Sequence, residues 1–180
     1  MPVSKPKVPH VIRTVRIPAT MDKALRKIAK GKSTSVNALV EASLTKLIEF
    51  DQFADELEFA SVRKVMLVKG LDYLSDDQVV EFGIWTAKES GSELLKFYHG
   101  DDNLDSVIHI MESVFSKYGR MFTFHHEIEG RTHTIMMTHR LSRKWSILFD
   151  ANLKTVFARI GIDLRSEVGS TYVRAQFEKE

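Results

Sequence analysis

The sequence predicts an α+β protein in two parts, a short basic N-terminal part and a larger part built on an antiparallel sheet with packed helices. Apolar residues recur at helical spacing in some segments and alternate in others, with turn residues between them. Residues 1–50 hold 10 Lys and Arg against 3 Asp and Glu, a net charge of +7. Residues 51–180 hold 16 against 21, a net charge of −5. The net charge of +2 for the whole chain is therefore the sum of a basic part and an acidic part.

The N-terminal part reads as one strand followed by two helices. Side chains over Ile12–Pro18 alternate with the period of a strand, and Pro18 ends it because it has no N–H for a ladder. Apolar residues at helical spacing then indicate a helix that closes at Gly31, followed by a second helix with Ser33 as its N-cap. The apolar face of the second helix is formed by Val36, Leu39, Val40, Leu44, Leu47 and Ile48.

This order resembles the ribbon-helix-helix family of DNA-binding proteins, to which the Arc and MetJ repressors belong. The matching residues are 14–18, 31–33 and the apolar run after Ser33. The resemblance implies that two chains pair their strands into a ribbon that enters the major groove. Ile12, Thr14 and Arg16 would then face the bases, although Ile12 offers only apolar contact.

The resemblance also implies a phosphate contact at the start of the second helix. Free N–H groups near Ser33, Thr34 and Ser35 would point at a phosphate, assisted by the helix dipole. Lys32 adds a charge beside them. A solvated Arg16 and a Ser33 that only caps a helix are the structural alternatives, and the charge of the N-terminal part favours DNA binding.

Composition excludes several classes of function. The chain has no cysteine, which rules out disulfides, thiolate metal sites and cysteine nucleophiles. No run of 18 apolar residues and no signal-peptide pattern occurs, so we expect a cytoplasmic protein that makes no contact with membranes. No nucleotide-binding fingerprint, zinc-protease motif or nucleophile elbow is present. We therefore expect neither an enzyme nor a cofactor.

The larger part reads as alternating helices and hairpins. We expect a strand over Val62–Val68, a helix capped by Ser75, a helix over Asp102–Tyr118, a hairpin turning at Glu129–Gly130, a helix from Ser142 to Gly161 and a final hairpin around Gly169–Ser170. This order predicts an antiparallel sheet with helices on one face. The segment from Val62 onward is also weakly similar to a region of uncharacterised archaeal proteins, which implies no activity.

Four histidines fall within one predicted hairpin. A turn at Glu129–Gly130 would place His126 and His133 directly opposite each other, close enough to share a transition metal. His139 would point to the same face, and His125 to the other. His126 and His133 also share their stripe with core residues, however, so packed structural histidines are the favoured interpretation.

These observations predict a flexible arm at 1–11, a ribbon-helix-helix domain at 12–50, a linker at 51–61 and a sensing or assembly domain at 62–180. The expected function is a sequence-specific DNA-binding transcriptional regulator, typically a repressor, that acts on double-stranded DNA as a homodimer or higher oligomer. Its C-terminal domain would bind a small-molecule effector or drive assembly. Two alternatives stay open: a metal-responsive regulator that uses the C-terminal histidines, and an antitoxin that binds a toxin partner.

Overall fold

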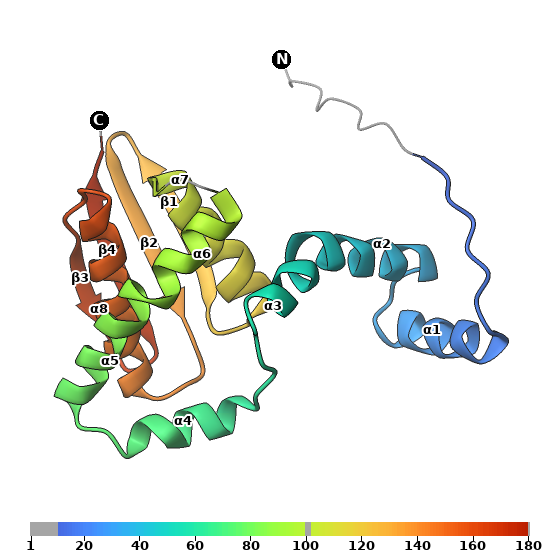
Figure 1. Cartoon of the computed structure of the whole chain (residues 1–180), viewed down its shortest axis with the longest axis horizontal. Coiled ribbons are helices and arrows are strands. Elements are labelled where there is room, and N and C mark those ends of the chain that lie inside the picture. The colour runs from blue at the N-terminus through green and yellow to red at the C-terminus, as the bar shows by residue number, and fades with distance from the viewer. Residues whose placement is uncertain (1–10, 100–101, 180) are drawn as a thin grey trace. The chain divides into compact units, whose positions relative to one another are not determined.

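The computed structural model describes residues 11–99 and 102–179, and the expected arm at 1–11 lies almost wholly outside them (Figure 1). The chain divides into two compact units, Met1–Leu47 and Ile48–Glu180, which we call the N-terminal and C-terminal units. None of the helices in the described residues is long and apolar enough to span a bilayer.

The N-terminal unit contains two helices, α1 (Ala19–Gly31) and α2 (Val36–Lys46). Val11–Pro18 is extended but forms no strand, so the expected strand over Ile12–Pro18 is wrong for this chain. A strand needs a neighbour to accept and donate its backbone hydrogen bonds, and no described segment supplies one. Pro18 is instead the N-cap residue of α1, and its carbonyl accepts from the N–H groups of Met21 and Asp22. The fold prediction of an N-terminal ribbon is therefore corrected to an extended segment followed by two helices.

The turn between α1 and α2 differs from the expected caps. Gly31 lies inside α1, and the residue with a left-handed backbone is Ser33, at a φ of 51°. Ser35, not Ser33, caps α2, because its side chain accepts from the N–H of Ala38. A serine with positive φ cannot serve as an N-cap, which needs extended backbone.

Helices make up the first half of the C-terminal unit. They begin with the π-helix η1 (Leu47–Asp51), which starts at the unit boundary, and end with a second π-helix before the sheet. Between the two π-helices lie α3 (Gln52–Glu56), α4 (Lys64–Asp72), α5 (Asp76–Lys88), α6 (Ser90–His99) and α7 (Leu104–His109). The second π-helix is η2 (Ile110–Tyr118). The stretch expected as a linker at 51–61 thus holds α3, and its Leu57 packs against the core.

The expected strand over Val62–Val68 is also wrong, because Lys64–Asp72 is helical. Leu67, Val68 and Leu71 face the core, whereas Val65 and Met66 are exposed. That burial has the helical period of 3.6 residues rather than the strand period of two. The capping box predicted at Ser75 is confirmed, since Ser75 and Gln78 exchange hydrogen bonds at the start of α5.

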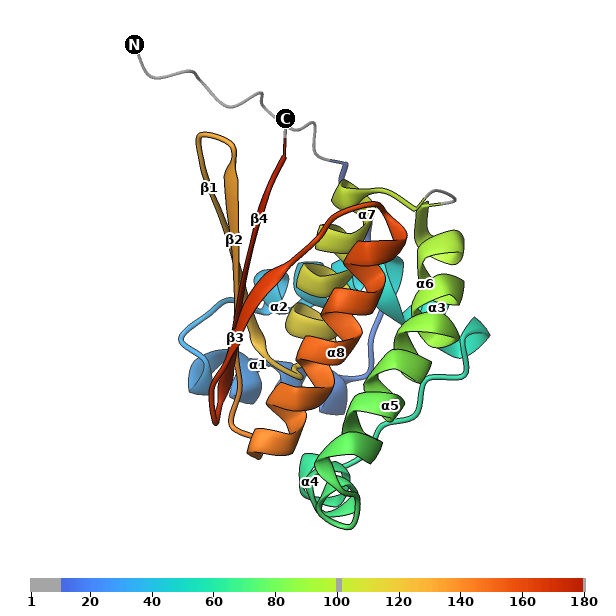
Figure 2. The ribbon, with the colours of Figure 1, turned by 90° about the vertical axis from the view of Figure 1, so that its left-hand side faces the viewer.

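A four-stranded antiparallel sheet forms the rest of the unit, together with the helix α8 (Arg143–Arg159). The strands are β1 (Thr123–Glu129), β2 (Thr132–Thr138), β3 (Arg165–Val168) and β4 (Tyr172–Glu178), in the order β1-β2-β4-β3. Figure 2 shows α8 against one face of the sheet and α5 on the far side of α8. The prediction of an α+β unit with an antiparallel sheet and helices on one face is confirmed.

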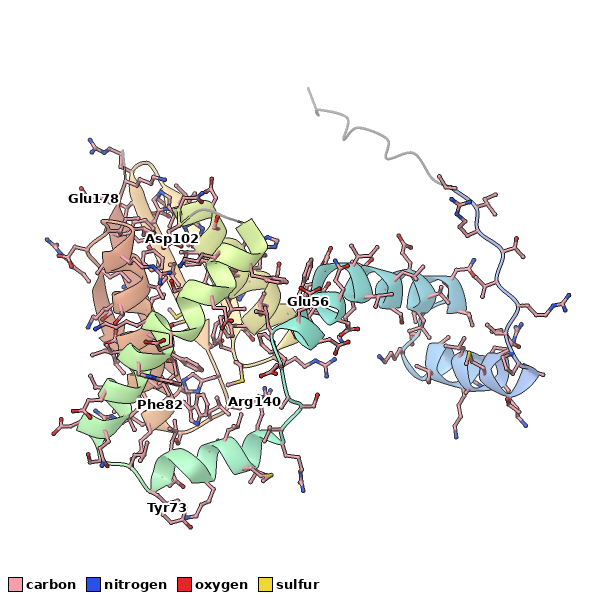
Figure 3. The ribbon with its side chains drawn as sticks, viewed as in Figure 1. Glu56, Tyr73, Phe82, Asp102, Arg140 and Glu178 are labelled. Atoms are coloured by element: carbon pink, nitrogen blue, oxygen red, sulfur yellow. The ribbon has the colours of Figure 1, made fainter. Side chains whose placement is uncertain are left out.

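The core lies between this sheet and its helices. Alternate residues of the central strands are fully buried, among them Ile135 on β2 and Val173 and Ala175 on β4. They meet Leu153 and Phe157 of α8 and Val114 of η2 in the same apolar cluster. An ion pair also joins α8 to the segment just before α7, because Arg159 Nε lies 3.0 Å from Asp102 Oδ2. Asp102 is labelled in Figure 3.

Helices α5 and α8 approach closely at Gly83. A Cβ atom on Gly83 would lie 2.7 Å from the carbonyl oxygen of Leu148 and 2.9 Å from the Cβ of Ala151. Asn152 of α8 reaches back and donates to the Thr86 hydroxyl at 3.1 Å. Glycine therefore sets the spacing of this helix pair.

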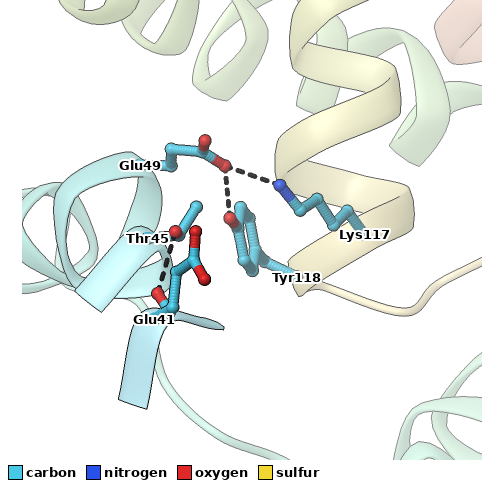
Figure 4. Close-up of polar contacts among 5 residues, drawn as sticks. All are labelled: Glu41, Thr45, Glu49, Lys117 and Tyr118. Carbon is cyan, nitrogen blue, oxygen red and sulfur yellow. Dashed lines mark hydrogen bonds and ion pairs between the residues drawn. The ribbon is translucent and has the colours of Figure 1, made fainter. Parts of the chain in front are cut away.

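A polar cluster joins η1 to η2 within the C-terminal unit (Figure 4). The Glu49 carboxylate accepts from Lys117 Nζ at 2.6 Å and from the Tyr118 hydroxyl. These bonds, the one from Lys117 foremost, lower the pKa of Glu49. Phe50 stacks on the Tyr118 ring with centroids 5.3 Å apart, so the cluster has an apolar side as well.

Candidate DNA-binding unit and histidine pair

The residues expected to read DNA bases lie on the extended segment before α1. Ile12, Thr14 and Arg16 are all exposed there, and Ile12 keeps 92% of its surface accessible. The structure gives these three side chains no common strand face. What it does show is an accessible basic segment that carries Arg13 and Arg16.

The residues expected to bind phosphate lie in the turn between α1 and α2. Three of their N–H groups are already used, because Lys32 N donates to Ile28 O at 3.0 Å, Ser33 N to Lys30 O at 3.2 Å and Thr34 N to Ala29 O at 3.0 Å. These bonds close the C-terminal end of α1. By helix geometry, the N–H groups of Val36 and Asn37 have no acceptor within α2 and point outward from its N-terminus. Lys32 and the Ser33, Thr34 and Ser35 side chains surround that end of the helix and are exposed.

The N-terminal unit has almost no core of its own. Of its described residues, only Ala29 is buried. Large apolar side chains on the extended segment and on both helices are exposed instead: Val11, Ile12, Val15, Ile17, Met21, Ile28, Val40, Leu44 and Leu47. Such a unit buries little apolar surface, which is the main source of stability in a small domain.

The histidine pair lies on the core-facing side of the C-terminal sheet. His126 is opposite Ile135 and His133 is opposite Ile128, so the two histidines are not directly opposed as expected. The two-residue loop is Gly130–Arg131, and Gly130 has the positive φ of 63° that a glycine at the first loop position allows. The loop is thus one residue later than predicted, which shifts the pairing by two residues and keeps both side chains on one face.

The two imidazoles still meet across this diagonal. His126 Nε2 lies 2.9 Å from His133 Nδ1, and the rings stack with centroids 5.1 Å apart. His133 also stacks on Phe177 of β4, at 4.7 Å. Burial, followed by the neighbouring His133, lowers the pKa of His126, against a smaller opposing effect of Glu112 on η2. The lowered pKa favours the neutral form of His126.

His139 is a buried structural histidine. Its Nδ1 accepts from the backbone N–H of Leu141 at 3.2 Å, which makes Nε2 the protonated nitrogen. Nε2 lies 2.9 Å from the Ser146 hydroxyl, and burial lowers the pKa of His139. Both ring nitrogens are thus used by the neutral form. Within the described residues, no three His, Cys, Asp or Glu side chains are grouped as a metal site would need.

Two parts of this picture were missed from the sequence. Ser35 could have been found, because it precedes a helical run and lies three residues before Ala38, the spacing of an N-cap bond. Phe177 could not, because its contact with His133 depends on which strands of the sheet are neighbours.

Comparisons with known proteins give little similarity. No protein-family model matches the chain, and no curated protein does. Among solved structures, the chain is similar to the crystal structure of an Fe(II) unliganded H-NOX protein, a point mutant, from K. algicida. The two share 15% identity over 67% of this chain and 75% of that chain, with a TM-score of 0.44. No comparison places the chain in the ribbon-helix-helix family or beside archaeal proteins, so both resemblances are corrected.

Proposed function

We propose that the protein is a DNA-binding regulator that acts as a homodimer through its N-terminal unit. The C-terminal unit would bind an effector or support assembly. The observation that carries the proposal is the separation of charge along the chain. Residues 1–50 have a net charge of +7, whereas residues 51–180 have a net charge of −5. A basic unit joined to an acidic one is typical of a polyanion-binding domain linked to a second domain with another role.

The dimer follows from the missing core of the N-terminal unit. Only Ala29 is buried among its described residues, while Ile28 of α1 and Val40 and Leu44 of α2 are exposed. The chain has no cysteine, so no disulfide bond can stabilise so small a unit. A second copy supplies matching apolar faces at the same position, and two-fold pairing is the commonest assembly of soluble proteins.

Two groups of side chains support DNA contact. Arg13 and Arg16 lie on an exposed extended segment, where guanidinium groups can bind phosphates or guanine edges. The N-terminus of α2, with Lys32 beside it, has the N–H groups of Val36 and Asn37, which by helix geometry find no acceptor within the helix, and presents the positive end of a helix dipole to a phosphate. A dimer would present each group twice.

The metal-responsive alternative has weaker support. His126 and His133 bring two ring nitrogens within 2.9 Å, but a mutual hydrogen bond explains that distance. The described residues supply no third ligand grouped with them. We therefore favour a small molecule or a second copy as the partner of the C-terminal unit.

Selection of bound duplexes from a random DNA pool tests the proposal. We expect enrichment of a two-fold symmetric sequence, because a homodimer reads two half-sites. The same selection with the Arg16→Ala variant, compared with the native chain, shows whether Arg16 contributes to base preference or only to charge. Failure to enrich any sequence, together with no retention of duplex DNA at low salt, would reject DNA binding.

A further inference from the structure

β1 is an edge strand of the C-terminal sheet, with β2 as its neighbour on one side. Backbone bonds at the two ends of β2 show which groups of β1 are used. Just before β2, Arg131 O accepts from Lys179 N at 3.0 Å, and just after it, His139 N donates to Thr171 O at 2.9 Å. The odd-numbered residues of β2 therefore bond toward β4, and the even-numbered ones bond toward β1.

The open side of β1 carries the backbone groups of Phe124, His126 and Ile128. The even-numbered residues of β2 are paired with the odd-numbered residues of β1, so the N–H and C=O groups of these three residues point away from β2. In the described chain, no other segment forms a backbone hydrogen bond with them. The Ile128 side chain is also 57% exposed. A strand edge of this kind is a template for one more strand.

The sequence of β1 is complementary to itself in one antiparallel register. A two-fold axis through His126, the middle residue, pairs all seven residues of β1 with a second copy. This register places His125 opposite Glu127 and Phe124 opposite Ile128, each pair twice. An imidazole N–H can donate to the Glu127 carboxylate, and the exposed Ile128 gains an apolar neighbour.

The neighbouring registers are less complementary. An axis through Glu127 would set two Glu127 carboxylates directly opposite each other, which is destabilising. An axis through His125 would pair only residues 123–127 of each strand and leave Ile128 beyond them. The pairing of unlike groups on both faces of β1 therefore favours a second copy of this chain, centred on His126.

We propose that two chains join through their β1 strands, antiparallel about His126, so that two four-stranded sheets form one continuous sheet. Backbone hydrogen bonds from Phe124, His126 and Ile128 hold the two strands together, and the side-chain pairs fix the register. This interface gives the C-terminal unit the assembly role proposed above, on which the inference rests, and it needs no DNA.

Disulfide cross-linking of the full-length chain tests this register, because the native chain has no cysteine. His125→Cys and Glu127→Cys chains are mixed, refolded together from urea and oxidised with glutathione disulfide. In a mixed pair the two substituted residues are directly opposite, with Cα atoms about 4.5 Å apart, a distance that a disulfide spans. Either variant alone places its two thiols on a diagonal of about 7–8 Å, at or beyond the limit for a disulfide. We expect the mixture to form covalent dimer about tenfold faster than either variant alone.

A mixture of Thr123→Cys and Glu127→Cys chains is the matched control. Thr123, His125 and Glu127 are exposed on the same face of β1, but Thr123 is opposite Glu129 in the proposed register. Chance collisions would cross-link the two mixtures alike. Circular dichroism confirms that each refolded variant is native-like before oxidation.

Two results would overturn the β1 interface. One is cross-linking of the control mixture as fast as that of the His125→Cys and Glu127→Cys mixture. The other is a His125→Cys and Glu127→Cys mixture that stays monomeric on a non-reducing gel. Because the experiment contains no DNA, its failure is distinct from a failure of DNA binding, which the selection of duplexes measures.

Discussion

His126 Nε2 and His133 Nδ1 lie 2.9 Å apart although the two residues are not opposite each other in the sheet. The contact runs diagonally from β1 to β2 and is extended by the stacking of His133 on Phe177 of β4. It links three adjacent strands on the face that carries the core. Because an N–H···N bond needs one unprotonated nitrogen, the contact is sensitive to acid.

The first prediction concerns pH. The pKa values of His126 and His139 are lowered in the folded chain, chiefly by burial, from an ordinary value of 6.5. As the pH falls, the unfolded chain protonates these two histidines before the folded chain does. Their contribution to the free energy of unfolding is therefore complete above pH 6.5 and is lost as the pH falls through the pKa values of the folded chain. Urea unfolding of the native chain between about pH 8 and pH 5 should show this loss. His126→Gln and His139→Asn should each reduce it, and an unchanged pH dependence in both variants would contradict the prediction.

The second prediction concerns Gly83. Gly83→Ala should destabilise the C-terminal unit by about 1–3 kcal/mol, because the added methyl group meets the Leu148 carbonyl and Ala151. The matched control is Gly70→Ala on α4, where nothing lies within 4 Å of the new Cβ. That change should stabilise by about 0.5–1 kcal/mol, the ordinary gain from alanine in a helix. Thermal unfolding of the two variants compares them, and equal shifts would refute a close contact at Gly83.

The third prediction concerns Glu49. Glu49→Gln should cost at most about 1 kcal/mol, since the Glu49 and Lys117 side chains are both exposed and salt screens their attraction. The cost should shrink further in about 1 M salt. A larger loss that persists in high salt would show that the bond from Tyr118, rather than the ion pair, is the stabilising contact.

The fourth prediction concerns assembly. Removal of residues 1–47 should leave a folded C-terminal unit, because the described core cluster lies entirely within that unit. Dimerisation should be lost or weakened, since the exposed apolar faces of α1 and α2 are removed. Light scattering of both forms at micromolar concentration measures the difference. A full-length chain that stays monomeric there would contradict the dimer.

Local signals predicted local structure well. The capping box at Ser75, the helix over Arg143–Arg159 and both C-terminal hairpins follow from spacing and turn residues alone. Short apolar runs were harder, because Val62–Val68 fits a strand until burial of Leu67, Val68 and Leu71 shows the helical period. In the candidate site, the contact between His126 and His133 depends on the register of β1 against β2. The loop lies one residue later than predicted, which changed that register. The strand over Ile12–Pro18 required a partner segment that the described chain does not provide.

The fifth prediction concerns recognition of DNA. Arg16→Ala should cost about 1–3 kcal/mol on the selected duplex and relax base preference at one position, because a bidentate guanine contact is lost. Lys32→Ala should weaken all duplexes alike and lower the salt slope by about one unit, since it removes a single phosphate contact. Fluorescence anisotropy on the selected and a scrambled duplex separates the two effects. An Arg16→Ala chain that binds every duplex with native affinity would remove Arg16 from the interface.

The most direct test of the central claim is the affinity of the full-length chain and of residues 48–180 for one selected duplex, measured over a range of salt concentrations. We expect tight binding by the full-length chain that falls steeply with salt, because the basic N-terminal unit releases counterions from DNA. Residues 48–180, which lack that unit, should show no binding. Equal binding by the two forms, or binding by the full-length chain that does not change with salt, would contradict DNA binding by the N-terminal unit.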